Sequence, residues 1–282
     1  MEVSSLWFNA QFTMGAAPHV LRLRRLEGKI LKPFIQIDFE NDCYQVKTVN
    51  HPEELAQVLR LRFEVFFGEF SSKKIKFPFL PYDVDWHDFS CDHLIVKDKK
   101  EGKVVACYRL LSSRSEKKKR LFYSEGEFEI DDLMRLPGHK LELGRACVHR
   151  DYRNGAVISL LWKGLIEYAR KSKTRYLFGC SSINRKDFSR LPEMMKYLEV
   201  KDAFIAGMEV VVKPKYRVPF SIESSSVVKA DGKVMNSLMH MYLMAGAKMG
   251  KTVAYDSEMD CLDMFTVLDL HNLPPSFERR FA

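Results

Sequence analysis

The sequence lacks a long uninterrupted apolar run, which excludes a typical bilayer-spanning helix. No stretch of about 18 or more consecutive apolar residues occurs in the chain. Its first 20 residues also lack Lys and Arg, and a basic cluster follows them instead of preceding them, which is the wrong order for a secretory signal. We therefore expect a cytoplasmic protein that is either soluble or peripheral on the inner face of the membrane.

Metal-ligand and disulfide spacings are missing as well. None of the six cysteines forms a Cys-x-x-Cys pair, and most lie within apolar runs, as reduced core thiols do. Because no His-x-x-His or Cys/His pairing occurs either, we predict no metal site and assign His93 and His149 to structural roles. Zinc-finger spacing and RNP-like aromatic motifs are also absent, so nucleic acid is not an expected partner.

The charge balance favours anionic partners. The chain has 45 Lys and Arg residues against 37 Asp and Glu, which gives a formal net charge of +8 and a sequence pI near 9.1. The sign of the charge alone does not distinguish an acidic protein from an anionic lipid. Basic and apolar residues are mixed between positions 21 and 32, a pattern compatible with a basic arm over residues 1–40 that faces an anionic membrane surface.

The hydrophobic periodicity predicts one mixed α/β domain over residues 41–282. Helical spacing of apolar residues predicts a helix that starts at Pro52 and another from about Val157 to Tyr168. A C-terminal elaboration begins at about residue 187, with a strand-like run at 204–212 and a Met-rich helix at 234–246. Strand patterns occur at 44–49, 92–96, 104–111, 141–148, 175–183 and near 252 and 262, the second and third joined as a hairpin through Gly102.

Six charged residues lie inside or beside otherwise apolar elements. Charges in such places need partners of opposite sign, so we predict that they form one ion-pair network. A single residue of this kind is more often part of a structural salt bridge, whereas six together indicate a functional cleft. The six residues are Arg62, Arg109, Arg145, Asp85, Asp88 and Glu142.

The strand at 141–148 contains a glycine between two of these charges. Glu142 and Arg145 are three residues apart, so a regular strand would point them to opposite faces of the sheet. A β-bulge at Gly144 would put them together, and glycine inside a strand is a common marker of a bulge. An unpaired backbone N–H at such a bulge can stabilise an oxyanion.

Seven sequence stretches that together cover most of residues 45–185 follow one another in a characteristic order: LRFEVFF (61–67), DVDWHDFSCDHLIV (83–96), VVACYRLL (104–111), FYSEGEFEI (122–130), LELGRACVHRDYR (141–153), LLWKGL (160–165) and YLFGCSSI (176–183). In sequence and spacing they resemble the ornithine acyl-ACP N-acyltransferases, also called hemolysin-like, of the GNAT superfamily. The resemblance implies a GNAT-like, mostly antiparallel central sheet flanked by helices. It also implies an enzyme that transfers a long-chain fatty acyl group, in some cases 3-hydroxylated, from acyl carrier protein to an amino acid such as ornithine.

The same residues are similar, more distantly, to positions of the acyl-homoserine lactone synthases. This likeness implies catalytic roles for Glu142, Gly144 and Arg145. It implies substrate-binding roles for Arg62, Phe66, Asp85, Asp88 and Arg109.

The loop at residues 151–158 bears on the acyl donor. GNAT enzymes that use acyl-CoA carry a Gly-rich loop here that binds the pyrophosphate, but this loop has one glycine, Gly155. An acyl carrier protein presents a single phosphodiester, so this departure favours the carrier protein as partner. We expect no bound cofactor, a phosphopantetheine thioester as co-substrate, and a docking role for Arg150 and Arg153.

An amine attacks a thioester only when it is neutral, so a proton acceptor assists the reaction. Glu142 is the candidate, directly or through water; its rival role is electrostatic, through pairing with Arg145. Asp85 and Asp88 can bind a cationic amino acid, whereas Arg62 and Arg109 can bind its carboxylate or complete an ion-pair scaffold. Two alternatives stay open: a different amine acceptor, such as glycine or a signalling precursor, and a non-catalytic acyl-binding protein at the membrane.

Overall fold

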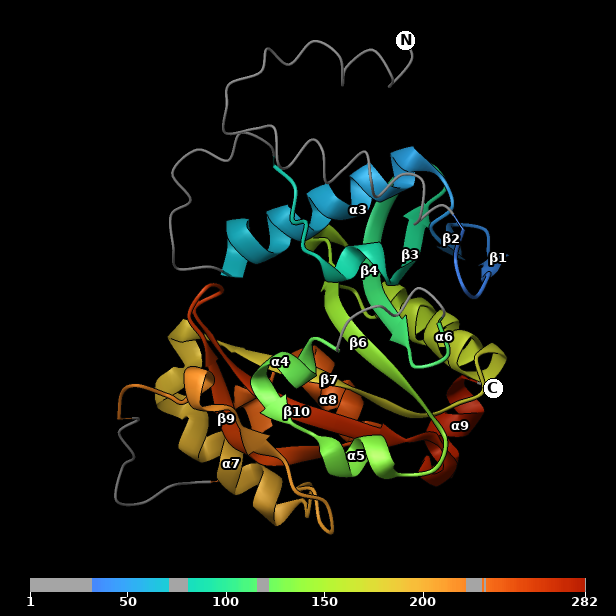
Figure 1. Cartoon of the computed structure of the whole chain (residues 1–282). Helices are drawn as coiled ribbons and strands as arrows, with labels where there is room; N and C mark the ends of the chain where they lie inside the picture. The colour runs from blue at the N-terminus through green and yellow to red at the C-terminus, as the bar shows by residue number, and fades with distance from the viewer. Residues whose placement is uncertain (1–31, 71–80, 116–121, 222–229, 231, 282) are drawn as a thin grey trace. The chain divides into compact units, whose positions relative to one another are not determined.

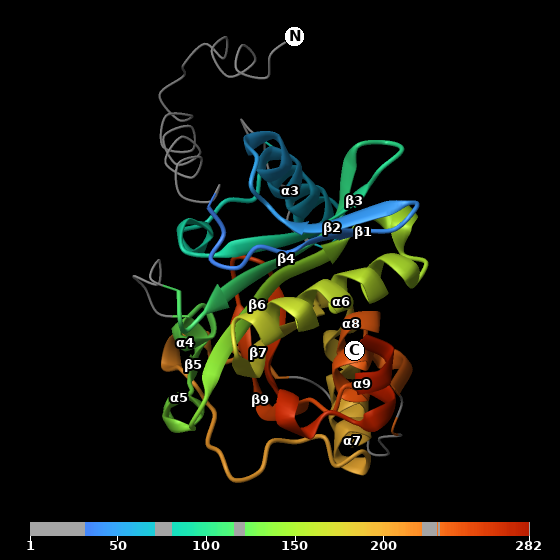
Figure 2. The same ribbon diagram turned by 90° about the vertical axis from the view of Figure 1, so that its right-hand side faces the viewer.

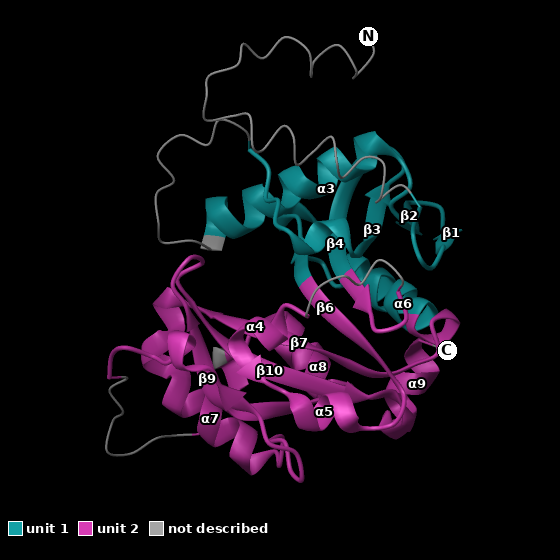
Figure 3. Ribbon diagram, in the orientation of Figure 1, with its two compact units in different colours: residues 1–69, 74–109, 145–168 teal, residues 70–73, 110–144, 169–282 magenta. Residues whose placement is uncertain are grey.

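Strands β4 (Lys103–Ser112) and β6 (His139–Val148) run through both of the compact units into which the chain divides (Figure 3). The computed structural model describes residues 32–70, 81–115, 122–221, 230 and 232–281 (Figure 1). The first unit comprises residues 1–69, 74–109 and 145–168; the second comprises residues 70–73, 110–144 and 169–282. Most of the predicted basic arm, residues 1–31, lies outside the described residues.

The strands of the first unit follow the order β1-β2-β3-β4-β6. Strands β1 (Asp38–Glu40) and β2 (Tyr44–Thr48) are antiparallel, and β2 is antiparallel to β3 (Asp92–Asp98). The predicted hairpin of β3 and β4 is confirmed. Its turn contains Gly102 with φ 62°, a left-handed conformation that glycine adopts without the steric cost of a Cβ.

Helix α3 (Pro52–Val65) packs on one face of these strands. The sequence favours its start, because Pro52 suits the first helical position and two acidic residues follow in the first turn. Its apolar stripe, which includes Val58 and Leu59, is buried against Ile95 and Cys107 of the sheet. Beyond Val65 the chain continues as one π-helical segment, Phe66–Phe70.

Helix α6 (Ala156–Lys171) lies on the opposite face from α3 (Figure 2). Gly164 allows the close approach, because an added Cβ there would come within 2.7 Å of Val46 and 3.2 Å of Leu94. Leu94 of β3 contacts α6, and Ile95 of β3 packs with the buried residues of α3. The two residues are adjacent on the strand, so their side chains point to opposite faces of the sheet. The helix also supplies the connection between β6 and β7 that a parallel strand pair requires.

The strands of the second unit follow the order β4-β6-β7-β10-β9. Strand β7 (Thr174–Asn184) is parallel to β6, whereas β10 (Cys261–Asp269) is antiparallel both to β7 and to β9 (Lys248–Asp256). A two-stranded sheet joins β5 (Phe128–Glu129) to β8 (Val211–Val212). The central sheet is therefore mixed and mostly antiparallel, as predicted.

Short helices cover both faces of these strands. The segment of α4 (Ser124–Glu127) and β5 lies on one face, and α8 (Ser237–Met244) lies on the other (Figures 1 and 2). Aromatic rings fill the space under α4 and β5, with Phe122 against Phe178 at 5.0 Å and Phe128 against Phe265 at 5.8 Å between ring centroids. The remaining helices are α5 (Asp131–Arg135), α7 (Leu191–Val200) and α9 (Pro275–Phe281).

The strand-like run predicted at 204–212 is largely wrong. Strand structure there is limited to the two residues of β8 and a single bridge from Phe204 to Met249. Gly207, with φ 71°, interrupts the run between them. The Met-rich helix is shorter than predicted, because the Asn236 side chain caps it by accepting a hydrogen bond from the Met239 N–H, and Gly246, with φ 88°, follows its end.

In the ranges that the structure describes, none of the helices combines the length and the apolar character needed to cross a bilayer.

Candidate functional site

A fully buried arginine on α3 stands at the centre of the charged site in the first unit. The Nε of Arg62 donates to Asp83 Oδ2 at 2.8 Å. Its two terminal nitrogens donate to the two oxygens of Asp88 at 2.7 and 3.2 Å. This paired geometry matches the planar fork of the guanidinium to the carboxylate, which is the strongest form of this ion pair.

Two more arginines, from β4 and β6, complete the network. Arg109 Nη1 donates to Asp85 Oδ2 at 2.6 Å and to Asp88 Oδ1 at 3.3 Å. Arg145 donates to Asp83 Oδ2 at 3.0 Å and to Asp85 Oδ2 at 3.3 Å. We call these three arginines and three aspartates the arginine–aspartate network; its formal charges balance.

The network holds its members in their charged forms. Burial raises the pKa of Asp85, but the guanidinium of Arg109, the hydrogen bond from His87 and the charges of Arg145 and Arg62 together bring that pKa well below its usual range. Burial also raises the pKa of Asp88, and Arg62 above all lowers it below its usual value. For Arg62, burial lowers the pKa, yet Asp83 and Asp88 together raise it above the ordinary value. Asp85 and Asp88 are therefore too acidic to accept a proton from a substrate at neutral pH.

His93 lies beside the network as a neutral side chain. Burial lowers its pKa to about 4, against the attraction of Asp88, whose Oδ1 is 3.8 Å from Nε2. Both ring nitrogens are buried without a hydrogen-bond partner among the described residues. The contacts are those of a core residue, and they place no second metal-ligating side chain on the ring.

The structure brings together five of the six charged residues that the sequence singled out, and it adds Asp83. Asp83 accepts from both Arg62 and Arg145 and was missed by the sequence reasoning. The available signal was its position two residues before Asp85. Local turns hold this segment, since Asp85 Oδ1 accepts from the His87 N–H at 2.7 Å and Asp88 Oδ2 accepts from the Asp85 N–H at 2.9 Å.

The irregularity predicted at Gly144 falls on the next residue. Arg145 has φ 48°, a left-handed conformation that costs a residue with a side chain on the order of 1–3 kcal/mol. Its ion pairs with Asp83 and Asp85 and its position over the Phe66 ring, at 5.8 Å from the centroid, hold it there. The strained residue is therefore the one whose side chain the network fixes.

Glu142 belongs to the second unit and has different partners. Its Oε2 accepts from the Tyr123 N–H at 2.8 Å, and its Oε1 accepts from the N–H and the hydroxyl of Ser124, both at 2.7 Å. The side chain is buried, with 5% of the residue exposed. Glu142 thus anchors the start of α4, a contact that the sequence did not indicate. Its pairing with Arg145 stays a prediction.

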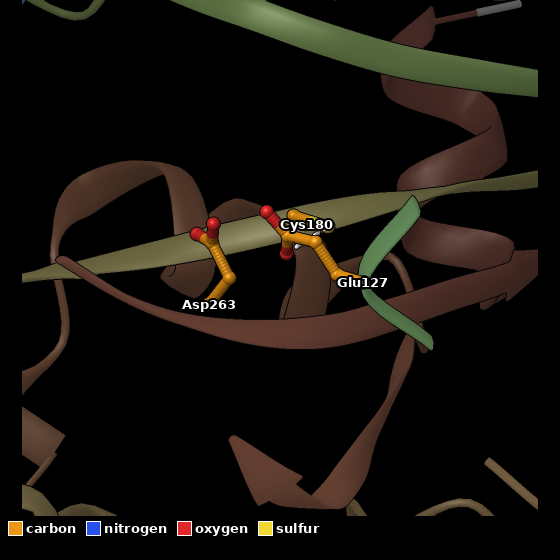
Figure 4. Close-up of side chains that lie close together, drawn as sticks. All are labelled: Glu127, Cys180 and Asp263. Carbon is orange, nitrogen blue, oxygen red and sulfur yellow. Dashed lines mark hydrogen bonds between the residues drawn. The ribbon is translucent and has the colours of Figure 1, made fainter. Parts of the chain in front are cut away.

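A second group of acids in the second unit was not singled out from the sequence. Glu127 at the end of α4, Cys180 on β7 and Asp263 on β10 point toward one another (Figure 4). Their potential ligand atoms lie within 4.8 Å of each other. Asp256, Cys261 and Asp263 form a second such set. We call these five residues the acidic cluster. Among the described residues, this cluster is the one place whose side chains could hold a metal ion. The sequence had predicted no metal site.

The titration of the cluster favours protons over a metal. Burial, followed by the nearby charge of Asp263, raises the pKa of Glu127 to about 9. Burial also raises the pKa of the Cys180 thiol well above its usual value. Both groups are therefore protonated at neutral pH, and a metal would have to displace those protons before binding.

The predicted docking arginines differ in their surroundings. Arg150 is exposed. Arg153 pairs with Glu69 at 2.9 Å and donates from Nε to the Val148 carbonyl at 3.0 Å. The single glycine of the loop, Gly155, has φ 84° immediately before α6.

The chain is also rich in aromatic residues that could line an acyl site, at positions 63, 67, 70, 77, 79 and 86, and the structure describes some of them. Phe63 and Phe67 contact each other at 5.4 Å between ring centroids, and Trp86 is 44% exposed beside Phe89. The side chains of residues 70, 77 and 79 lie outside the described part of the chain.

Comparison with known proteins identifies relatives over most of the chain. Residues 61–163 match the family described as an acetyltransferase (GNAT) domain. The L-ornithine N(alpha)-acyltransferase of Rhodobacter capsulatus is 26% identical over 235 residues, which are 80% of this chain and 90% of that protein. The protein of the same name from Rhizobium meliloti is 31% identical over 201 residues, which are 67% of each chain.

A solved structure is also similar. It is the CoA-dependent acyl-homoserine lactone synthase BjaI, with 14% sequence identity, a TM-score of 0.45, and coverage of 82% of this chain and 80% of that one. The sequence relatives support an acyltransferase that acts on an amino acid. With the GNAT match and a relative at 31% identity, this chain belongs to the L-ornithine N(alpha)-acyltransferase family.

Proposed function

We propose that the protein transfers a long-chain fatty acyl group, in some cases 3-hydroxylated, from acyl carrier protein to the α-amine of ornithine or a related amino acid. The observation that carries this proposal is the membership of the chain in a family whose relatives are named for acylation of L-ornithine. The product would be a lyso-aminolipid. Peripheral contact with the inner face of the membrane suits such a product and is part of the proposal.

In the proposed reaction, the neutral amine attacks the thioester carbonyl carbon. A C–N bond forms, the C–S bond breaks, and the phosphopantetheine thiolate takes up a proton as the amine loses one. Glu142 is a candidate acceptor for that proton, directly or through water. Its two oxygens accept hydrogen bonds from three donors of Tyr123 and Ser124, which fix the orientation of the carboxylate. A carboxylate has about four lone-pair sites, so these contacts support a positioning role of Glu142 and are also compatible with proton transfer.

Two features support acyl carrier protein as the donor. The formal charge of +8 suits an acidic carrier protein. The loop before α6 offers one glycine, Gly155, where acyl-CoA enzymes of this superfamily carry several, so a single phosphodiester fits it better than a pyrophosphate. Arg150 is exposed beside this loop in sequence and is available for the carrier protein.

The reaction is tested by lipid mass spectrometry on a host that expresses the wild type, Glu142→Gln or the control Glu129→Gln. We expect a new N-acyl amino acid with the wild type and with the control, because Glu129 is exposed on β5. Glu142→Gln should reduce the product by about tenfold or more, since an amide cannot accept from all three donors as a carboxylate does. Purified protein assayed with acyl-ACP and acyl-CoA then identifies the donor.

Each outcome of this experiment separates the candidates. A new lipid with a different amine head group would replace ornithine as acceptor. Equal rates with acyl-CoA would refute the carrier-protein preference. No product in cells or with purified protein across several acyl-ACPs and amines would favour a non-catalytic acyl-binding protein.

The carrier-protein surface is tested by charge reversal at Arg150. Arg150→Glu should raise the KM for acyl-ACP by about three- to tenfold and leave kcat near the wild-type value, because a surface charge contributes mainly to encounter and docking. Arg135→Glu is the matched control, since Arg135 is also exposed, with 75% of its side chain accessible. A KM that does not depend on the charge at position 150, or that rises equally in the control, would remove Arg150 from the docking surface.

A further inference from the structure

The acidic cluster contains a buried carboxylate oxygen that lacks a partner. Glu127 is 2% exposed, and its Oε1 has no hydrogen-bond partner among the described residues. Its other oxygen is 3.6 Å from Cys180 Sγ. An unsatisfied carboxyl oxygen at this depth costs on the order of 1–3 kcal/mol, and a bound ligand that donates to it would remove this cost.

The orphaned oxygen points into a set of further acceptors. Figure 4 shows the Glu127 and Asp263 carboxylates facing each other, with Cys180 beside Glu127. Asp256 is next to Asp263 in the cluster and accepts from the Tyr123 hydroxyl at 3.2 Å. A positively charged donor placed among these oxygens would be bonded by several of them at once.

The cluster lies on the same face of the sheet as Glu142. Glu142 pairs with Phe178 on β7, and the residues two and four positions further along that strand are Cys180 and Ser182, which share its face. Ser182 in turn pairs with Asp263 on β10. Within the second unit, Glu142 and the acidic cluster therefore lie on the same face of the sheet.

Hydrogen bonds connect Glu142 to the cluster through one serine. The Ser124 hydroxyl donates to Glu142 Oε1 at 2.7 Å and lies 3.6 Å from Cys180 Sγ. Cys180 Sγ is in turn 3.6 Å from Glu127. Glu142 and Glu127 are thus two intervening side chains apart, a separation that one small amino acid can span.

The arginine–aspartate network does not provide a comparable site for a cation. Asp85 and Asp88, which the sequence suggested for a cationic acceptor, are bonded by Arg62 and Arg109. Their negative charge is matched by guanidinium groups within 2.6 to 3.3 Å. Glu127 differs, because the strongest charge acting on it is that of another acid, Asp263.

We propose that Glu127 and Asp263 bind the side-chain ammonium of a basic amino-acid acceptor and select for it. The proposal deepens the proposed function and rests on it, because it assigns the acceptor's second amine to a site on the face that holds Glu142. In the unliganded protein the proton on Glu127 serves as counter-ion. When the ammonium binds, the carboxyl proton is released to solvent, and the ammonium donates to the Glu127 oxygen that has no partner among the described residues.

The chemistry of the cluster suits an ammonium better than a metal ion. The ligand atoms lie within 4.8 Å of one another, a spacing that an ammonium bonded to each at about 2.8 Å can bridge. Zinc bound by Cys180 would need the thiol ionised. Burial instead raises the pKa of Cys180 and keeps that thiol protonated.

The test compares two acceptors that differ only in the second amine. L-Ornithine and L-norvaline are assayed with acyl-ACP against the wild type, Glu127→Gln, Asp263→Asn and the control Glu129→Gln. We expect both cluster variants to raise the KM for ornithine by about tenfold or more, with kcat and the kcat/KM for norvaline close to wild type. The control, an exposed acid on β5, should match the wild type with both acceptors.

A binding measurement keeps the proposal falsifiable if turnover fails. Titration calorimetry of the full chain should show ornithine binding that norvaline lacks and that Glu127→Gln weakens; this result supports the site even in a protein without transferase activity. Equal losses with both acceptors, or equal binding of ornithine and norvaline, would overturn the proposal while leaving the transferase activity standing. Stoichiometric divalent metal in the purified wild type, lost in Asp263→Asn, would overturn it in favour of a metal site.

Discussion

Replacing Arg62 with methionine should lower the free energy of unfolding by about 3–5 kcal/mol. Methionine keeps much of the apolar stem but removes the guanidinium that bonds Asp83 and Asp88. The two carboxylates then stay in a buried site with one positive charge fewer than they need, and breaking a buried ion pair from one side costs this much because the remaining charge is uncompensated. Urea denaturation monitored by circular dichroism measures the change.

Arg60 on the same helix provides the control. Arg60 is exposed and lies over the Tyr82 ring at 5.8 Å, so Arg60→Met should cost no more than about 1 kcal/mol. If Arg62→Met were as stable as this control, the network would not be a source of stability. A double variant, Arg62→Met with Asp88→Asn, should recover part of the loss, because it removes one of the stranded charges.

The charged residues of the network could be predicted because they stand within sequence patterns whose other residues are apolar and expected to be buried. Arg62 and Arg109 lie in strongly apolar helix and strand patterns, and such residues need partners of opposite sign. The same reasoning named Asp85 and Asp88 as those partners. Asp83 escaped it because the segment before it is broken by proline and shows no periodicity that would mark the residue as buried.

The contacts of Glu142 could not be predicted in this way. Two of its three donors are backbone N–H groups of Tyr123 and Ser124, 19 and 18 residues earlier in the chain. Backbone donors are the same for nearly every residue type, so they leave no trace in the amino-acid sequence. The sequence prediction paired Glu142 with Arg145 because their charges are opposite. Backbone N–H groups carry no formal charge, so a prediction from charge cannot find them.

Glu127 was hidden for a related reason. Its neighbours Glu125, Gly126 and Glu129 give the segment the look of an exposed turn. The burial comes from tertiary packing, since β5 and the end of α4 cover the strands on which Phe265 and Asp263 lie. A polar local pattern on a buried segment is expected at functional sites, where local preference and global fold disagree.

The second large effect is a pH dependence caused by Glu127. As pH rises from about 5 to about 9, the free energy of unfolding of the wild type should fall relative to that of Glu127→Gln. Burial and the charge of Asp263 raise the pKa of Glu127 from 4.5 to about 9 in the folded protein. Between these values the folded state keeps a proton that the unfolded state has released, so the unfolding free energy decreases as pH rises. Below pH 4.5 both states are protonated and the penalty vanishes.

The size of this effect is on the order of 3 kcal/mol, about half of what the full pKa difference would give. Glutamine stays neutral, so Glu127→Gln should gain on the wild type steadily across the window, as measured by urea denaturation at pH 5.5, 7.0 and 8.5. A stability difference that is constant with pH would mean that Glu127 ionises normally in the folded protein. Ornithine added at pH 8.5 should raise the stability of the wild type and leave Glu127→Gln nearly unchanged, because a ligand that binds only the folded state stabilises it and the variant lacks the carboxylate that pairs with the ammonium.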